Sequence, residues 1–273
     1  LTIEDAVGNI VEVPIKVTAP EYALRLDQGG NLKSHYFCYA NYAERINKEP
    51  ELGALKQLTL EMNCYIHTYR GLQTFMGYEN YLMIRGEGDS NGKVRIVSPG
   101  DNLDIRSVNP FPINEWYHLA LVIDLDETTN AKKYKLYRNG VLDEINFVKE
   151  EYSFETISLL GDVSKMDGSL SIGQATEQEW RAMQGVVSYA RVWKEARTQQ
   201  QIKDNMNSLV DTDVENLVSF WNFSEGKATS TIHDIANDDG TTNLIISKVE
   251  YATKGNDAVE VKTTDFEDKG VIY

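Results

Sequence analysis

Hydrophobic and polar residues alternate along much of this chain, most clearly between Leu58 and Tyr69. Successive side chains of a strand point to opposite faces of its sheet, so this alternation predicts a strand with one apolar face. The apolar face, which we expect in the core, holds Leu58, Leu60, Met62, Cys64 and Ile66. The opposite face holds Glu61, Asn63, Tyr65, His67 and Tyr69.

Further short runs of the same kind follow one another along the chain. They predict strands at residues 23–27, 81–85, 93–98, 116–125, 133–141, 169–173, 186–193, 217–223 and 244–249. Gly, Asn and Asp separate these runs, which favours an antiparallel sandwich over alternating strands and helices. The segment with Tyr36, Tyr39 and Tyr42 lies outside these runs and is interpreted as a rim loop.

One short helix is predicted after residue 198. Thr198 and Gln201 have the spacing of a capping box, in which each side chain binds a backbone N–H of the other residue. Ile202, Met206 and Leu209 then form a single apolar stripe. The pattern predicts a surface helix that lies on a sheet edge.

The first 19 residues differ from the rest. Val11, Val13, Ile15 and Val17 alternate with polar residues, and Pro14 restricts this strand to a sheet edge. Two interpretations stay open for residues 1–19: an edge strand of the main sandwich, or the tail of a preceding immunoglobulin-like domain. Residues 20–273 are predicted to form the main domain.

Size and charge narrow the class of protein. A chain of 273 residues can bury a full core, and all-β domains reach roughly 200–250 residues. A formal net charge of −15 repels polyanions, which excludes nucleic acids as expected partners. No apolar run approaches the roughly 20 residues of a membrane helix, so direct membrane insertion is not expected. Cys38 and Cys64 form no C-x-x-C motif, and whether they form a disulfide stays open.

Several motifs occur in an order that is typical of one family of folds. They are the L-T-L-E-M strand at 58–62, the W-x-H strand at 116–124 with its partner at 134–140, the G-x-x-x-x-x-R-V-W strand at 185–193, and the W-N-F-S-E-G segment at 217–240. Together they resemble the laminin G-like (concanavalin A-like) jelly-roll family over roughly residues 20–250. The resemblance implies an all-β, two-sheet antiparallel jelly-roll sandwich with a concave outer face and one short surface helix.

The resemblance also implies a function class. Such domains bind glycans or proteins, in modules of secreted or cell-surface bacterial proteins, and act as glycoside hydrolases only when carboxylates recur at i, i+2 and i+4 on one strand. Asp124 and Asp126 are followed by Thr128, and Glu177 and Glu179 form only a pair in a loop. We therefore expect a non-catalytic carbohydrate-binding or adhesion module. A glycoside hydrolase with dispersed carboxylates and a protein–protein or structural module are the alternatives.

The polar face of the 58–69 strand is the first candidate ligand surface. Aromatic rings stack on the C–H faces of sugars, and amide or carboxylate groups bind hydroxyls. The candidate residues are Glu61, Asn63, Tyr65, His67 and Tyr69, together with Trp180 in a polar loop. In the alternative interpretation, other segments cover this face and make it a second small core. Trp116, Trp193 and Trp221 lie within strands and are expected in the core.

Calcium is the one cofactor that the resemblance suggests, because members of the family often hold this ion at the sandwich edge, and oxygen ligands from loops suit it. Asp27 matches the end of the family's early strand, although Gln28 separates it from Gly29. Asp234 matches the aspartate after the W-x-F-x-E-G strand, and Asp238 lies nearby. These three residues are the candidate calcium ligands.

Overall fold

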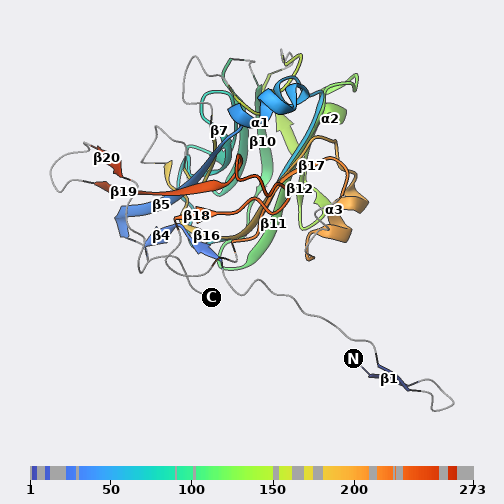
Figure 1. Ribbon diagram of the computed structural model, residues 1–273, viewed down its shortest axis with the longest axis horizontal. Helices are drawn as coiled ribbons and strands as arrows, with labels where there is room; N and C mark the ends of the chain where they lie inside the picture. The colour runs from blue at the N-terminus through green and yellow to red at the C-terminus, as the bar shows by residue number, and fades with distance from the viewer. Residues whose placement is uncertain are drawn as a thin grey trace.

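The computed structural model places two large antiparallel sheets face to face (Figure 1). It describes residues 2–4, 10–12, 23–28, 31–89, 91–100, 103–149, 154–161, 169–174, 181–208, 214–223, 225, 230–251 and 258–262. Every strand pair in these ranges is antiparallel. The prediction of an all-β, two-sheet sandwich is therefore confirmed.

Within the described residues, the smaller sheet has seven strands. Their order is β13 (Val141–Leu142), β12 (Tyr134–Arg138), β11 (Trp116–Asp124), β6 (Gln57–Ile66), β16 (Gly185–Trp193) and β17 (Leu217–Trp221), with β3 (Leu24–Arg25) also paired to β16. The predicted central hairpin is its β11–β12 pair, in which Leu121 lies opposite Leu136.

The larger sheet has eleven strands in the part of the chain that the structure describes. Its order is β14 (Ile145–Phe147), β10 (Leu103–Pro110), β9 (Lys93–Ser98), β8 (Leu82–Gly86), β7 (Thr74–Tyr78), β15 (Ser169–Ile172), β5 (Asn31–Asn41), β19 (Leu244–Tyr251) and β18 (Thr231–Ile232), with β4 (Asp27–Gln28) beside β5 and β20 (Ala258–Lys262) beside β19. The rim loop predicted around Tyr36 and Tyr42 is wrong, because β5 is an interior strand of this sheet and both rings are buried in the core.

The predicted strand at 23–27 is two strands, one in each sheet. β3 pairs with β16 of the smaller sheet, and β4 pairs with β5 of the larger one. Between them Leu26 is fully buried; its N–H donates to the carbonyl of Gly185, and its carbonyl accepts from the N–H of Tyr36. This segment therefore crosses the sandwich from one sheet to the other.

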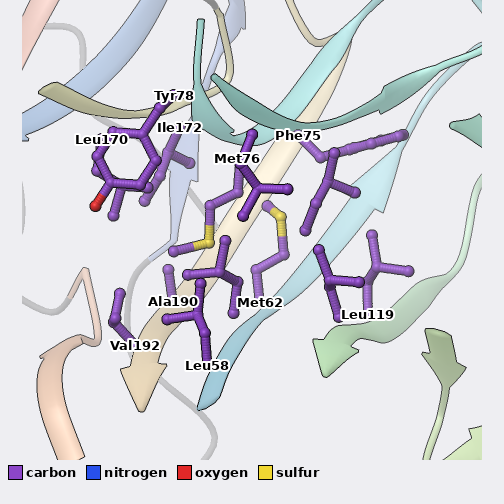
Figure 2. Packing of buried hydrophobic residues seen from close by; sticks show 14 of the residues in the cluster. Leu58, Met62, Phe75, Met76, Tyr78, Leu119, Leu170, Ile172, Ala190 and Val192 are labelled. Carbon is purple, nitrogen blue, oxygen red and sulfur yellow. The ribbon is translucent and has the colours of Figure 1, made fainter. Parts of the chain in front are cut away.

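The main core lies between the two sheets. The five apolar residues of β6 all belong to it, as their alternation predicted. In Figure 2, Leu58 and Met62 of β6 point toward Met76 of β7 and Ile172 of β15. Each such side chain contributes roughly 1.5–3 kcal/mol when it is fully buried.

Both cysteines are free and buried, which answers the question of a disulfide for this structure. Cys38 lies on β5 and Cys64 on β6, so the two thiols belong to different sheets. Burial raises the pKa of the Cys64 thiol to about 12 and also raises the pKa of Cys38. Both groups therefore behave as small apolar core residues.

Three α-helices and one 3₁₀ helix occur in the described residues. They are α1 (Ala43–Lys48), η1 (Pro50–Gly53), α2 (Asn130–Lys133) and α3 (Gln199–Asn205). The helix α3 is the predicted one, and its capping box joins Thr198 to Gln201. Its Ile202 packs on Ala120 and Val122, so α3 covers the outer face of the smaller sheet rather than an edge alone. No helix in the described ranges is long and apolar enough to span a membrane.

Two short strands near the N-terminus, β1 (Thr2–Glu4) and β2 (Ile10–Glu12), pair with each other. In the part of the chain that the structure describes, they pair with no strand of either large sheet. Of the strand predicted from Val11 to Val17, residues 13–17 lie outside the described residues. Both interpretations of residues 1–19 remain predictions.

Candidate functional site

The outer face of the smaller sheet carries the candidate ligand residues of β6. Across the sheet, Trp116 lies opposite Tyr65, His118 opposite Asn63, and Ala120 opposite Glu61. Residues paired in this way point to the same face of the sheet. On the other side of β6, Arg191 of β16 lies opposite Glu61, so the register brings side chains from β6, β11 and β16 together on one surface.

One half of this surface is covered, and Glu61 lies in that half. Its Oε1 accepts hydrogen bonds from Trp193 Nε1 (2.7 Å) and Arg191 Nη1 (3.3 Å), and its Oε2 lies 3.1 Å from His118 Nε2. All four side chains are buried. We call Glu61, His118, Arg191 and Trp193 the buried ionic cluster.

The pKa of Glu61 shows how well the cluster compensates a buried charge. Burial alone would raise this pKa, but the hydrogen bond and charge of His118, with the charges of Arg191 and Arg197, lower it to about 2. The carboxylate is therefore ionised and fully engaged, out of reach of a ligand. For Glu61, the alternative interpretation of a covered face agrees with the structure.

Arg191 also fixes the helix that covers this half. Its Nη1 and Nη2 donate to the carbonyls of Asn205 (3.0 Å) and Ser208 (2.6 Å), and the hydroxyl of Tyr189 donates to the carbonyl of Met206 (2.6 Å). These carbonyls at the C-terminal end of α3 have no partner within the helix, and a cation there is favourable.

The other half of the surface is open and aromatic. Trp116 is 39% exposed, and its ring meets Tyr65 edge-on, with centroids 5.7 Å apart. The ring of His67 lies 5.2 Å from that of Tyr65. We call Tyr65, His67 and Trp116 the aromatic patch. The structure thus brings two of the predicted ligand residues together.

Polar groups border the aromatic patch. Asn63 Nδ2 donates to Ser188 Oγ (2.8 Å). On the other side, Asp27 accepts a hydrogen bond from Arg25 Nε (2.7 Å), and its second oxygen lies 3.6 Å from His67 Nε2. The patch therefore has an aromatic centre with amide, hydroxyl and charged groups around it.

The expectation that Trp116 is a core residue is wrong. It is the first residue of β11, and the core residues of that strand are the odd-numbered ones, including Leu119 and Leu121. Period two then places Trp116 on the outer face. Trp193 and Trp221 are buried as expected, although Trp193 is buried in the covered half of the outer face.

Tyr69 is not part of the patch. β6 ends at Ile66, and Tyr69 then packs on the main core, with its hydroxyl donating to the carbonyl of Phe111 (2.6 Å). Trp180 lies outside the described residues.

Two of the three candidate calcium ligands, Asp27 and Asp234, already bind other groups of the protein. Oδ1 of Asp234 accepts from the N–H groups of Phe220 and Ala236, and its Oδ2 accepts from Thr242 Oγ1. Burial raises the pKa of Asp234, which disfavours a charged ligand there. Asp27 is paired with Arg25, a cation in its own right, and Asp238 is exposed.

Within the described residues, no three His, Cys, Asp or Glu side chains are grouped to hold a metal ion. The three aspartates therefore do not fit one shared calcium site as they are arranged. Calcium binding remains a prediction of the family resemblance.

A family model described as the concanavalin A-like lectin/glucanases superfamily matches residues 45–203. The chain belongs to this superfamily. The match covers more than half of the chain and includes β6, the central hairpin and β16. A search of curated proteins gave no match.

Solved structures show the same fold. A candidate carbohydrate-binding protein from Bacteroides ovatus ATCC 8483 is 20% identical, with a TM-score of 0.63, covering 94% of this chain and 66% of that one. The heptameric SAP-like pentraxin from Limulus polyphemus is 16% identical, with a TM-score of 0.50, covering 83% of this chain and 94% of that one. At these sequence identities the similarity shows that the chain shares the sandwich fold of these two proteins, and it does not assign their function to this chain.

Proposed function

We propose that this superfamily member is a non-catalytic carbohydrate-binding module whose ligand lies on the aromatic patch. The exposure of Trp116 beside Tyr65 carries the proposal. A large exposed aromatic side chain on a sheet face, bordered by polar groups, is typical of a ligand surface. The similarity to a candidate carbohydrate-binding protein from Bacteroides ovatus supports the same class.

The chemistry of the patch suits a sugar. The indole of Trp116 offers an apolar face for the C–H groups of a pyranose ring. Asn63 and His67 are half-buried beside Trp116 and offer an amide oxygen and an imidazole for sugar hydroxyls, whereas the hydroxyl of Ser188 is buried and holds the amide of Asn63. A secreted or cell-surface location on a bacterium belongs to the same proposal, since polysaccharides are encountered there.

A glycoside hydrolase is the weaker candidate. Retaining hydrolysis needs two carboxyl groups roughly 5 Å apart beside the substrate, one as acid and one as nucleophile. Near the aromatic patch, Glu61 is bound by His118 and Arg191, and Asp27, on β4 of the larger sheet, is paired with Arg25. Neither carboxylate is available as a second catalytic partner. A protein-binding module is the other alternative. It would use the same aromatic patch, so experiment must distinguish it from a glycan-binding module.

Affinity electrophoresis against a panel of neutral plant, fungal and host polysaccharides tests the proposal. We expect retardation by at least one polysaccharide and a loss of about tenfold or more in affinity for Trp116→Ala, from the loss of buried apolar area. Tyr65→Ala should weaken binding less, because its ring is less exposed than that of Trp116. Leu142→Ala is the matched control, since Leu142 is 53% exposed on the same sheet.

The outcomes separate the three classes of function. If Trp116→Ala is retarded as strongly as the wild type, the ligand binds somewhere other than the aromatic patch. Retardation by no polysaccharide, with capture of a protein that needs Trp116, would replace the glycan by a protein partner. Release of reducing sugar from any polysaccharide would revive the hydrolase.

A further inference from the structure

Three arginines lie side by side on the outer face of the larger sheet. Arg85 of β8 is paired with Arg95 of β9, and Arg95 is paired with Arg106 of β10. Residues directly opposite in this way have side chains only about 5 Å apart at their bases, and like charges there are destabilising. We call these three residues the arginine row.

Carboxylates compensate two members of the row. Asp104 accepts two hydrogen bonds from Arg95, at Nε (2.9 Å) and Nη2 (2.8 Å). Arg106 donates to Glu87 (2.7 Å) and lies 3.4 Å from Asp104. Arg95 and Arg106 are therefore held in ion pairs.

Arg85 differs from its neighbours. Among the described residues it makes no hydrogen bond and no ion pair, and its buried Nε has no partner. Thr74, which is paired with Arg85 on β7, likewise has a buried Oγ1 without a partner. The nearby carboxylate of Glu79 binds Arg181 instead (2.8 Å). Arg85 is nonetheless partly exposed, so its guanidinium can be reached from solvent.

Burial and two neighbouring arginines act against the charge of Arg85. Burial, and then the positive charges of Arg181 and Arg95, lower its pKa to about 10, against the opposing charges of Glu79 and Asp104. The lowered pKa means that burial and the neighbouring arginines destabilise the charged guanidinium more than Glu79 and Asp104 stabilise it. The arginine row stands in a chain with a net charge of −15.

We propose that Arg85 anchors an anion-binding site that takes a carboxylate or sulfate group. A guanidinium binds both kinds of oxyanion through two parallel N–H···O bonds, and Arg85 has these donors unused. That the anion is carried by a saccharide rests on the proposed function. The site itself lies on the opposite sheet from the aromatic patch and does not depend on that function.

Binding of small anions to the full chain tests the site directly. The probes are sodium glucuronate, sodium sulfate and the neutral methyl glucoside, followed by the nitrogen–proton NMR signals of the arginine side chains. We expect a saturable shift of the Arg85 signal with glucuronate or sulfate and none with methyl glucoside. Binding should weaken about ten- to a hundredfold in Arg85→Gln, as for a lost charged hydrogen-bond pair. Binding by glucuronate alone points to acidic sugars, and binding by sulfate alone points to sulfated ones.

Two control variants and the stability of Arg85→Gln complete the test. Lys132→Gln removes the same charge from an exposed side chain of α2 and should bind as the wild type does. Trp116→Ala should also bind the anions normally, which separates failure of this site from failure of the aromatic patch. Arg85→Gln should keep the wild-type Tm or raise it, because a like-charge contact is removed.

Two results would overturn the proposal. One is the absence of any shift at Arg85 with either anion, or equal binding by Arg85→Gln. The other is a large fall in Tm for both Arg85→Gln and Arg85→Lys, which would make Arg85 a structural residue.

Discussion

Replacing Glu61 by Gln tests whether the buried ionic cluster holds the covered half of the sheet together. The side chain keeps its size, and an amide oxygen can still accept from Trp193. The negative charge is lost, however, and Arg191 remains fully buried with two carbonyls and the rings of Tyr189 and Phe220 as partners, none of which carries a negative charge. Breaking a buried ion pair by removing one partner costs about 3–5 kcal/mol.

The pKa of Glu61 gives a second measure of the same loss. Its value falls from an ordinary 4.5 to about 2 in the folded protein. A shift of that size corresponds to about 3 kcal/mol of stability. Because the folded-state pKa is lowered, this stability is fully present above about pH 4.5 and is lost as the pH falls through about 2. Roughly 1 kcal/mol of it remains at pH 3.

Urea unfolding followed by tryptophan fluorescence at pH 7 and at pH 3 measures both effects. We expect Glu61→Gln to lose about 3 kcal/mol at pH 7 and roughly 1 kcal/mol at pH 3 relative to the wild type. Glu127→Gln is the matched control and should change stability by less than about 0.5 kcal/mol, because Glu127 forms only a surface pair with Lys132. A loss below about 1 kcal/mol at pH 7, or an equal loss at both pH values, would refute the reasoning.

Two further perturbations have defined outcomes. A Cβ at Gly185 would lie 2.2 Å from the backbone oxygen of Tyr65, so Gly185→Ala should push β16 away from β6. The free energy of unfolding, measured by chemical denaturation, should fall by about 2 kcal/mol or more. A smaller loss would show that the two strands can shift freely. Calcium should leave the Tm unchanged, since Asp27 and Asp234 are already engaged. A rise of several degrees that EDTA reverses and Asp238→Asn abolishes would instead support the calcium site that the family resemblance implies.

Much of the fold could be predicted because many of its strands have one polar, outward face and one apolar face in the core. Period two placed Leu58 and Ile66 in the core and Tyr65 outside it. The capping box at Thr198 located α3 for a similarly local reason, since both of its hydrogen bonds lie within four residues.

The missed elements lack that local signal. β5 is an interior strand whose apolar and polar residues do not alternate simply, and only its pairing with β15 and β19 identifies it. The strand at 23–27 divides at Leu26 because two different sheets bind its backbone, which no local pattern shows. Asn130–Lys133 forms a short helix between the strands predicted at 116–125 and 133–141 and includes the first residue of the second one.

The candidate site depended on contacts between distant residues. The carboxylate of Glu61 and the ring of Tyr65 lie on the same face of one strand, but only one is accessible. Arg191 and Trp193, more than a hundred residues later, bury Glu61, whereas the neighbour of Tyr65 is the exposed Trp116. Alternation gives the face of a residue, and the fold of the rest of the chain decides whether that face is covered.

The passage of residues 23–28 from one sheet to the other has a mechanical consequence. Leu26 hydrogen-bonds to Gly185 on one sheet and to Tyr36 on the other, with β3 and β4 paired on either side. A force applied to the chain before residue 23 is therefore carried first by β3 and the smaller sheet. It reaches β4 and the larger sheet only after Leu26 has left the core. Detachment of the entering chain thus occurs in two ordered steps, each resisted by a different sheet.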